Sequence, residues 1–250
     1  MKSKRFIGLI PLRLKSKRIF HKPLLNLIGL PLFVHVYRRA KLSLLLDDVI
    51  VCCDDFRIYN IAKKFNVKCI ITKKTHKNGT ERISEAYKKI KKNYDLIVDI
   101  QGDEPLLNPK HIDDVIKFHL RNMSSDIILP SLKIKKMNKT SIVKVIKNKN
   151  DEILYLSRKD VPYNFEKKKY HLYKHLSIIS FKPNALKKYS SSKKTYLEKL
   201  ENIELLRALE LGLKIKSLNL KGDSFSVDIK EDYVKALKKL PKDKIFKKYR

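Results

Sequence analysis

Apolar runs alternate with amphipathic stretches along the first half of the chain. Residues 5–11 (RFIGLIP) form an apolar run that ends at a proline, which is typical of a buried strand. Residues 31–46 carry apolar side chains at four-residue spacing, which predicts a helix. The alternation continues with strands expected at 48–53, 67–71 and 94–100 and helices expected at 55–65, 79–92 and 109–121. Strands that alternate with helices predict βαβ units and a parallel sheet.

The pattern changes after residue 124, where short apolar runs are separated by polar turns. These runs cover 126–134, 142–147, 152–157 and 170–181. They predict a mostly antiparallel extension over 124–182 rather than a separate domain. Beyond it we expect a helix at 195–211, a strand at 214–219 and a closing helix at 230–239. The sequence therefore predicts one α/β domain over 1–240, followed by a loosely held basic tail over 241–250.

The chain is strongly basic, with a net charge of +32 from 58 basic and 26 acidic residues. Such a charge raises the hypothesis of a nucleic-acid-binding protein. Most of the basic residues are lysines, however, and they are scattered wherever a helix or loop would be solvated. Nucleic-acid surfaces usually combine arginines and stacking aromatic rings on one face. We therefore expect a lysine-rich solvated surface and no specific nucleic-acid partner.

Cysteine content and hydropathy favour a cytoplasmic protein. Cys52, Cys53 and Cys69 are expected to be small buried side chains in a reducing compartment. No run of eighteen apolar residues occurs, so we expect no membrane span. The basic N-terminus precedes only a short apolar run at 6–12 with no small-residue cleavage site, which argues against a signal peptide.

The loop at 12–23 is the first of four polar segments that point to chemistry. It leaves the first predicted strand at its carboxyl end, where parallel sheets bind ligands. Its basic residues are Arg13, Lys15, Lys17, Arg18 and Lys22. Guanidinium and ammonium groups at such a loop suit the phosphates of a nucleotide. A charged, solvated loop is the alternative interpretation of these residues alone.

The second segment, QGDEP at 101–105, follows another predicted strand. It contains the only glutamine, Gln101, and one of just six glycines, Gly102. A sequence poor in glycine keeps it where the backbone needs unusual freedom or approaches a ligand closely. Carboxylates between a glycine and a proline can form a rigid platform for a divalent cation. An ordinary polar turn is the alternative.

Two further segments stand before predicted helices. In HKNGTERISEA (76–86), Asn78 or Thr80 can cap a helix whose N-terminus would face an anion. In SVDIKED (226–232), Asp228 follows a short apolar run and suits either a metal ligand or a helix N-cap.

Together and in this order, the four segments resemble the CMP-Kdo synthetases, the 3-deoxy-manno-octulosonate cytidylyltransferases. The family's IPAR-type loop ending in KPL stands here as IPLR and KPL, its HxSGTxR as HKNGTER, and its QGDEP unchanged. Later segments match too, namely ILYLSR (153–158), HLSII (175–179) and VDIKED (227–232). The resemblance covers about residues 6–235. It implies a Rossmann-like α/β nucleotidyltransferase fold with a mixed, mainly parallel sheet.

The resemblance also implies an activity and a homodimer formed through the antiparallel region. CMP would pass from CTP to the anomeric hydroxyl of Kdo or its 8-amino analogue, with release of pyrophosphate, for lipopolysaccharide or capsule synthesis. Arg13 and Lys22 would bind the CTP phosphates with Arg18 nearby, and Asp103 and Asp228 would ligate Mg²⁺; catalysis would depend on Arg13, Lys22 and the two aspartates. The remaining implied residues are Asn78, Gly79 and Thr80 for the nucleotide and Gln101, Arg158, His175 and Glu204 for the sugar acid.

The sequence departs from the family pattern mainly at the sugar acid positions. Ser177 and Ile179 replace the glycine and tyrosine of HLGIY, and Leu205 replaces a glutamine. Phe20 and His21 replace a proline–glycine pair, Leu12 replaces an alanine and Asn78 a serine. Lys174 before His175 resembles the branch that uses the amino analogue. We therefore expect a well-kept nucleotide half and an altered sugar half. The alternatives are a CMP-sialate-type synthetase, a nucleic-acid-binding protein and a homologue without turnover.

Overall fold

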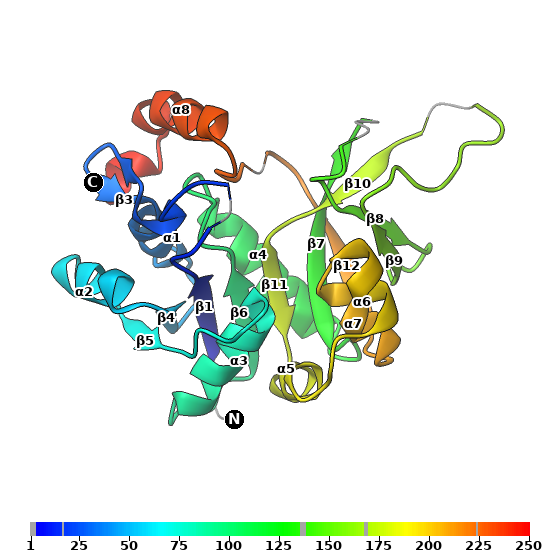
Figure 1. Cartoon of the computed structure of the whole chain (residues 1–250). Helices are drawn as coiled ribbons and strands as arrows, with labels where there is room; N and C mark the ends of the chain where they lie inside the picture. The colour runs from blue at the N-terminus through cyan, green and yellow to red at the C-terminus, as the bar shows by residue number, and fades with distance from the viewer. Residues whose placement is uncertain (1–3, 17, 136–138, 168–169, 224) are drawn as a thin grey trace. The chain divides into compact units, whose positions relative to one another are not determined.

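The structure is a computed structural model that describes every residue except 1–3, 17, 136–138, 168–169 and 224. Lys17, one of the basic candidates in the loop at 12–23, thus lies outside the described residues. The chain divides into two compact units (Figure 1). The first contains Met1–Asp113 and Ser224–Arg250, and the second contains Asp114–Asp223.

The first unit is built on the parallel sheet that the sequence predicts. Its strands are β1 (Phe6–Leu12), β4 (Asp48–Cys53), β5 (Cys69–Ile71) and β6 (Leu96–Ile100), paired in the order β5-β4-β1-β6. All three pairings are parallel. The helices that alternate with them are α1 (Leu32–Ala40), α2 (Phe56–Lys64), α3 (Gly79–Lys89) and α4 (Pro109–Arg121), the last of which starts in this unit. Strand β6 is buried throughout, because helices on both faces of such a sheet exclude water.

The carboxyl ends of these strands set the position of the polar loops. Leu12, the last residue of β1, pairs with Cys53, the last residue of β4. Gly102, just after β6, packs so tightly against β1 that a Cβ atom on it would lie 2.1 Å from Cδ2 of Leu12. The loop at 12–23 and the QGDEP segment therefore leave the sheet at the same edge.

The end of α1 differs from the prediction, which extended this helix from 31 to 46. The helix ends at Ala40, and the chain after it is held by the buried Asp113. The Asp113 carboxylate accepts hydrogen bonds from the hydroxyl of Ser43 at 2.5 Å and from the amide of Leu45 at 3.2 Å. This tertiary contact overrides a helical pattern that the local sequence could have continued.

The C-terminal segment packs against α1 within the first unit, which corrects the expectation of a loosely held tail. Helix α8 (Lys230–Lys239) is followed by the 3₁₀ turns η2 (Leu240–Lys242) and η3 (Phe246–Lys248). Phe246 is buried, and the Tyr249 hydroxyl lies 3.0 Å from Nδ1 of His35 and accepts from Nε of Arg39 at 3.1 Å. Two aromatic rings among lysines thus anchor the segment to α1.

Two small elements of the first unit were not predicted. These are the antiparallel ribbon of β2 (Asn26–Leu27) and β3 (Leu30–Pro31) and the 3₁₀ turn η1 (Lys22–Leu24). Cys52 and Cys53 are buried as expected, and Cys69 is half-buried. All three thiols are free, with Sγ of Cys53 and Sγ of Cys69 3.3 Å apart.

The second unit is organised around β7 (Ile127–Ile134). Strand β12 (Ile215–Leu220) is parallel to it, and β10 (Leu172–His175) and β11 (Ile178–Phe181) are antiparallel to it. Strands β8 (Lys144–Lys147) and β9 (Ile153–Ser157) continue from β10 through antiparallel pairs. The predicted antiparallel extension and the mixed α/β class are therefore confirmed.

The helices of the second unit depart from the predicted pattern. Helix α5 (Pro183–Ser190) was not expected, although the proline in its first turn is a typical start signal. The single helix expected at 195–211 is two short helices, α6 (Tyr196–Glu201) and α7 (Leu205–Glu210). They are separated at Asn202, whose φ of 51° ends the first helix. In the described part of the chain, no helix is long and apolar enough to cross a membrane.

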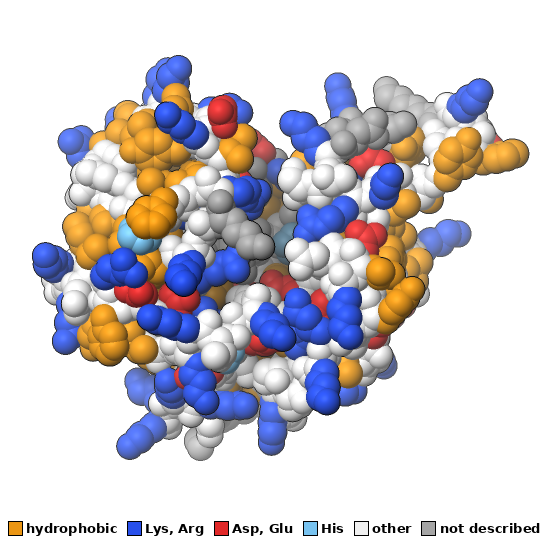
Figure 2. Space-filling model, viewed as in Figure 1, with side chains coloured by type: hydrophobic (Ala, Val, Ile, Leu, Met, Phe, Trp, Pro, Cys, Tyr) orange, Lys and Arg blue, Asp and Glu red, His pale blue; other side chains and the backbone are white. Residues whose placement is uncertain are grey.

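Basic side chains are spread over the face of the molecule that Figure 2 shows. Figure 2 shows Lys and Arg side chains, in blue, over both units, interspersed with apolar and neutral side chains.

Candidate active site

Four charged side chains of the first unit converge although they lie far apart in the sequence. The ammonium of Lys22 lies 2.7 Å from Oδ2 of Asp103 and 3.1 Å from Oδ1 of Asp228. Nη2 of Arg18 lies 2.7 Å from the same Oδ1 of Asp228. We call Arg18, Lys22, Asp103 and Asp228 the Lys22 cluster. It unites both predicted metal ligands with two of the predicted phosphate-binding residues.

Backbone contacts hold the two aspartates of the Lys22 cluster in place. The amide of Val227 donates to the carbonyl of Asp103 at 2.9 Å, which fixes the 226–228 segment beside QGDEP. The hydroxyl of Ser226 donates to Oδ2 of Asp228 at 3.1 Å. Ile229, not Asp228, is the N-cap of α8. The N-cap interpretation of Asp228 is therefore wrong, and its carboxylate is left to the cluster.

The opposite charges of the Lys22 cluster stabilise one another's ionised forms. Burial opposes the charge on Lys22, but the carboxylate of Asp103 and then that of Asp228 outweigh it and raise the pKa of the ammonium above 10.5. Burial also opposes the charge on Asp228, but Lys22 and then Arg18 outweigh it and lower the pKa of the carboxyl below 3.8. Both groups are thus ionised throughout the neutral pH range.

Arg13 lies outside the Lys22 cluster. It follows β1 as an exposed side chain, and within the described residues it makes no ion pair. Lys15 is exposed in the same loop. An exposed guanidinium at the carboxyl end of a strand is available to an incoming anion.

The N-terminus of α3 is directed toward this edge of the sheet. Oδ1 of Asn78 accepts from the amide of Glu81 at 2.8 Å, so Asn78 is the N-cap. A Cβ atom on Gly79 would lie 3.1 Å from Cγ of Pro11 and 3.3 Å from Nε2 of Gln101. Thr80 is buried in the first turn. The positive end of a helix dipole thus lies beside the end of β1, where an anion would be stabilised.

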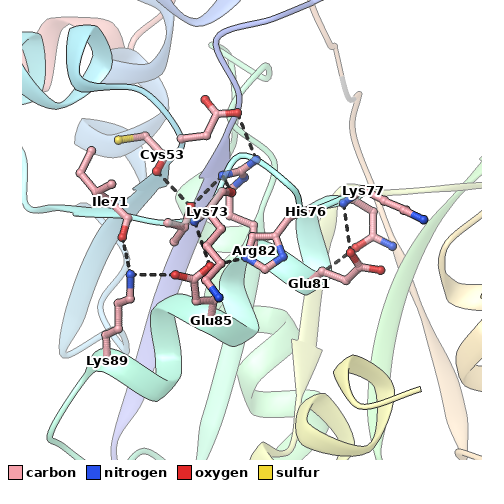
Figure 3. Close-up of polar contacts among 12 residues, drawn as sticks. Cys53, Ile71, Lys73, His76, Lys77, Glu81, Arg82, Glu85 and Lys89 are labelled. Atoms are coloured by element: carbon pink, nitrogen blue, oxygen red, sulfur yellow. Dashed lines mark hydrogen bonds and ion pairs between the residues drawn. The ribbon is translucent and has the colours of Figure 1, made fainter. Parts of the chain in front are cut away.

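Figure 3 shows the side chains that tie α3 to the segment before it. Oε2 of Glu81 accepts from the amide of Lys77 at 3.0 Å, and Glu85 contacts His76. Glu85 also accepts from the amide of Lys73 at 2.9 Å. These contacts fix the predicted nucleotide-binding segment rather than bind a ligand themselves.

The predicted sugar acid residues are divided between the units. Gln101 belongs to the first unit, and its Nε2 lies 3.3 Å from each carboxylate oxygen of Asp99. Arg158, His175 and Glu204 belong to the second unit.

Within the second unit, Arg158 holds the turn that carries Glu204. Its guanidinium donates to the carbonyls of Glu201 at 2.6 Å and Asn202 at 2.9 Å, and to that of Thr140 at 2.9 Å. Glu204 is the N-cap of α7, two residues beyond Asn202. Arg158 therefore fixes the turn before Glu204 through backbone carbonyls.

His175 and the two departures from the family, Ile179 and Leu205, belong to the second unit, and His175 is half-buried there. His175 is the last residue of β10, and burial lowers the pKa of its imidazole to about 4. The ring is therefore neutral at physiological pH, with one nitrogen that donates and one that accepts. Ile179 and Leu205 are both buried.

Comparison with known proteins decides the family. The model of the cytidylyltransferase family matches residues 7–215 of the chain. The chain belongs to the cytidylyltransferase family. It is 40% identical over 233 residues to the 3-deoxy-manno-octulosonate cytidylyltransferase of Fusobacterium nucleatum. The aligned region covers 91% of this chain and 94% of that protein. The 8-amino-3,8-dideoxy-manno-octulosonate cytidylyltransferase of Shewanella baltica is 35% identical over 241 residues, which are 94% and 98% of the two chains.

A solved structure resembles this cytidylyltransferase over nearly its whole length. It is that of a CMP:2-keto-3-deoxy-manno-octonic acid synthetase complexed with CTP. The TM-score is 0.91 at 28% sequence identity, with 96% of this chain and 99% of that chain covered. The expected nucleotidyltransferase fold is thereby confirmed.

The cytidylyltransferase has contacts at its site that the sequence did not predict. Ser226 donates a hydrogen bond to Asp228 of the Lys22 cluster. In the sequence, only its position two residues before Asp228 could have indicated this contact. His21 has a φ of 49°, in the left-handed region that favours glycine. This explains physically why the family pattern has glycine there. The His21 ring stacks on Phe20 with a centroid distance of 3.7 Å, and Phe20 is 80% exposed.

The donor set of the Lys22 cluster fits Mg²⁺. Two carboxylates meet on one ammonium, so both can reach a common cation. Among the residues that the structure describes, no three His, Cys, Asp or Glu side chains form a cage. Mg²⁺ commonly uses only one or two carboxylates and completes its shell with water and substrate phosphates. Asp103 and Asp228 are therefore the residues that would hold it.

Proposed function

We propose that this cytidylyltransferase transfers CMP from CTP to the anomeric hydroxyl of a 3-deoxy sugar acid, either Kdo or its 8-amino analogue. The single observation that carries the proposal is the Lys22 cluster, where two cations and two carboxylates meet at the carboxyl edge of a parallel sheet. The names of the relatives, one of which acts on the 8-amino compound, support the choice of substrate class.

The reaction is an in-line displacement at the α-phosphorus. The anomeric oxygen forms a bond to phosphorus, the bond from phosphorus to the bridging oxygen breaks, and pyrophosphate leaves with the electron pair. The hydroxyl proton passes to solvent. Such a transfer depends on positioning and on neutralising the phosphate charge. Bound Mg²⁺ would supply part of that neutralisation as a Lewis acid.

Different residues of the first unit bind different parts of the nucleotide. Arg13, exposed at the end of β1, and Lys22 bind the phosphates, and Arg18 lies beside Lys22 in the cluster. The N-terminus of α3, with Gly79 and Thr80, adds backbone donors for the nucleotide. Asp103 and Asp228 both form ion pairs with the ammonium of Lys22, and the same two carboxylates would hold Mg²⁺.

The residues of the second unit recognise the sugar acid. Neutral His175 donates and accepts one hydrogen bond, and Glu204 accepts from hydroxyl or ammonium groups. The aliphatic Ile179 and Leu205 make the pocket more permissive than that of the family pattern. We further propose a cytoplasmic homodimer that supplies activated sugar for lipopolysaccharide or capsule synthesis.

The test is pyrophosphate release from CTP with Kdo, 8-amino-Kdo and a sialic acid, with and without Mg²⁺. The proposal predicts release with one of the two octulosonates and only when the divalent cation is present. Release with the sialic acid alone would identify the sialate-type alternative instead. Binding of CTP without release for every acceptor would identify a homologue without turnover.

A further inference from the structure

Arg82 is a buried arginine on α3 whose charge faces away from solvent. Its side chain is only 4% exposed. Nη1 donates to Oγ1 of Thr72 at 2.7 Å and to the carbonyl of Lys73 at 3.2 Å (Figure 3). Nη2 donates to Oδ2 of Asp54 at 3.2 Å. These partners occupy the guanidinium, so Arg82 is not placed to bind a phosphate directly.

Asp54 carries the contact onward to the phosphate-binding loop. Its other oxygen, Oδ1, accepts from the amide of Leu14 at 2.9 Å. Leu14 is the residue after Arg13, and its own side chain is buried. One carboxylate thus joins the guanidinium of α3 to the first residues of the loop at 12–23. Along the chain, Leu14 lies 40 residues before Asp54, and Arg82 lies 28 residues after it.

Hydrogen bonds and strand pairing hold the segment behind Arg82 in place. The hydroxyl and amide of Thr72 both donate to the carbonyl of Cys53, at 2.9 and 2.8 Å. This places the end of β5 against the end of β4, immediately before Asp54. A loop fixed at such a segment keeps its geometry, and a small displacement of a binding group is costly in catalysis.

Arg82 also neutralises the charge of the Asp54 carboxylate. The Asp54 side chain is 12% exposed, so an unpaired carboxylate there would be poorly solvated. It would also repel the triphosphate bound by the neighbouring Arg13. The ion pair with Arg82 removes both penalties.

We propose that Arg82 is a positioning residue for CTP: through Asp54 it fixes the amide of Leu14, and with it the path of the chain at Arg13. The inference rests on the proposed function only in taking Arg13 as a phosphate ligand. A direct measurement of CTP binding therefore separates the two proposals, because it needs no sugar acid and no turnover.

The experiment measures CTP affinity by calorimetry, together with kcat, the KM for each substrate and the Tm. Arg82→Met is expected to weaken CTP binding by about tenfold or more, with the sugar acid KM changed by less than about twofold. Arg82→Lys keeps the charge but loses the fork, so it should restore part of the affinity. Arg39→Met is the matched control, because it removes another buried guanidinium of the first unit, one that contacts Leu107 and Tyr249 and does not touch Asp54 or Leu14. It should lower the Tm and leave CTP affinity unchanged.

A double-mutant cycle tests the route through Asp54. Asp54→Asn keeps an acceptor for Leu14 but removes the charge, so Arg82→Met in this background should cost much less affinity than in the wild type. The same loss in both backgrounds would overturn the proposal, as would an Arg82→Met variant with a lower Tm and wild-type CTP affinity. If Arg82→Met does not fold, Arg82→Lys in the two backgrounds gives the same comparison. Normal CTP binding by the wild type without transfer to any acceptor would refute the proposed function while leaving this inference standing.

Discussion

The nucleotide half and the sugar half of the molecule keep their family pattern to different degrees. In the first unit the predicted residues contact one another directly, as in the ion pairs from Lys22 to Asp103 and Asp228. In the second unit, by contrast, the guanidinium of the predicted residue Arg158 donates to three backbone carbonyls. Phosphate recognition needs charge, which is evident in a sequence. Sugar recognition needs shape, which depends on neighbours that the sequence does not reveal.

The largest expected effect is on the acidic side of the Lys22 cluster. Asp103→Asn keeps the size of the side chain but removes a charge on which Lys22 and Mg²⁺ depend, so transfer should fall by about 100-fold or more. Pyrophosphate release measures this, with circular dichroism to check the fold. Glu231→Gln, an exposed carboxylate three residues from Asp228, is the control and should keep wild-type activity. Near-normal turnover of Asp103→Asn would refute the metal assignment.

The basic side of the loop at 12–23 should show a graded response. Lys22→Ala leaves two carboxylates unneutralised and should lower kcat/KM for CTP by about 100-fold, and Arg13→Ala should have an effect of similar size. Lys15→Ala, exposed in the same loop, should change it by about twofold. Steady-state kinetics over a range of CTP concentrations measures all three. Equal effects would instead indicate a diffuse attraction by positive charge.

A substitution of Arg158, in the second unit, tests whether sugar acid binding can be impaired separately from CTP binding. Arg158→Met releases the turn before Glu204, so the sugar acid KM should rise by about tenfold while the CTP KM stays within about twofold. Lys159→Met is the adjacent control and should leave both values unchanged. A rise in the CTP KM alone would show that the division between the halves is drawn in the wrong place.

The smallest expected effect concerns pH. Because the pKa of His175 falls from 6.5 to about 4 on folding, the unfolded state binds the proton more readily. The stability that depends on neutral His175 is therefore present above pH 6.5 and is lost as the pH falls toward 4. NMR should show no titration of this ring between pH 8 and pH 5, with His175→Gln to assign its signal. A midpoint near 6.5 would show that folding does not lower the pKa of His175 and would contradict the prediction.

Much of the fold could be predicted from the sequence, and so could the polar segments that meet at one edge of the first sheet. The apolar runs located the strands of both units because burial imposes a pattern on each strand. Helix ends were less predictable, as Asn202 shows by dividing the helix expected at 195–211. The anchor formed by the buried Phe246 and the half-buried Tyr249 was missed because lysines surround both residues in the sequence.

Contacts across long sequence separations limited the prediction of the site. The segments QGDEP and SVDIKED were identified, but the bond from Val227 to Asp103 that joins them is visible only in the structure. The link from Arg82 through Asp54 to Leu14 likewise unites three segments that have no common local pattern. A motif reports which residue types are present, whereas positioning depends on the tertiary neighbours.

The most direct test of the account is identification of the product by ³¹P NMR and mass spectrometry, with CTP, Mg²⁺ and Kdo or 8-amino-Kdo supplied in excess. The account predicts that the three CTP signals are replaced by pyrophosphate and a single phosphodiester signal, with the mass of CMP joined to the sugar acid. The Asp103→Asn variant should leave CTP unchanged. Formation of free CMP or CDP with no sugar-linked phosphodiester from either octulosonate would contradict the account.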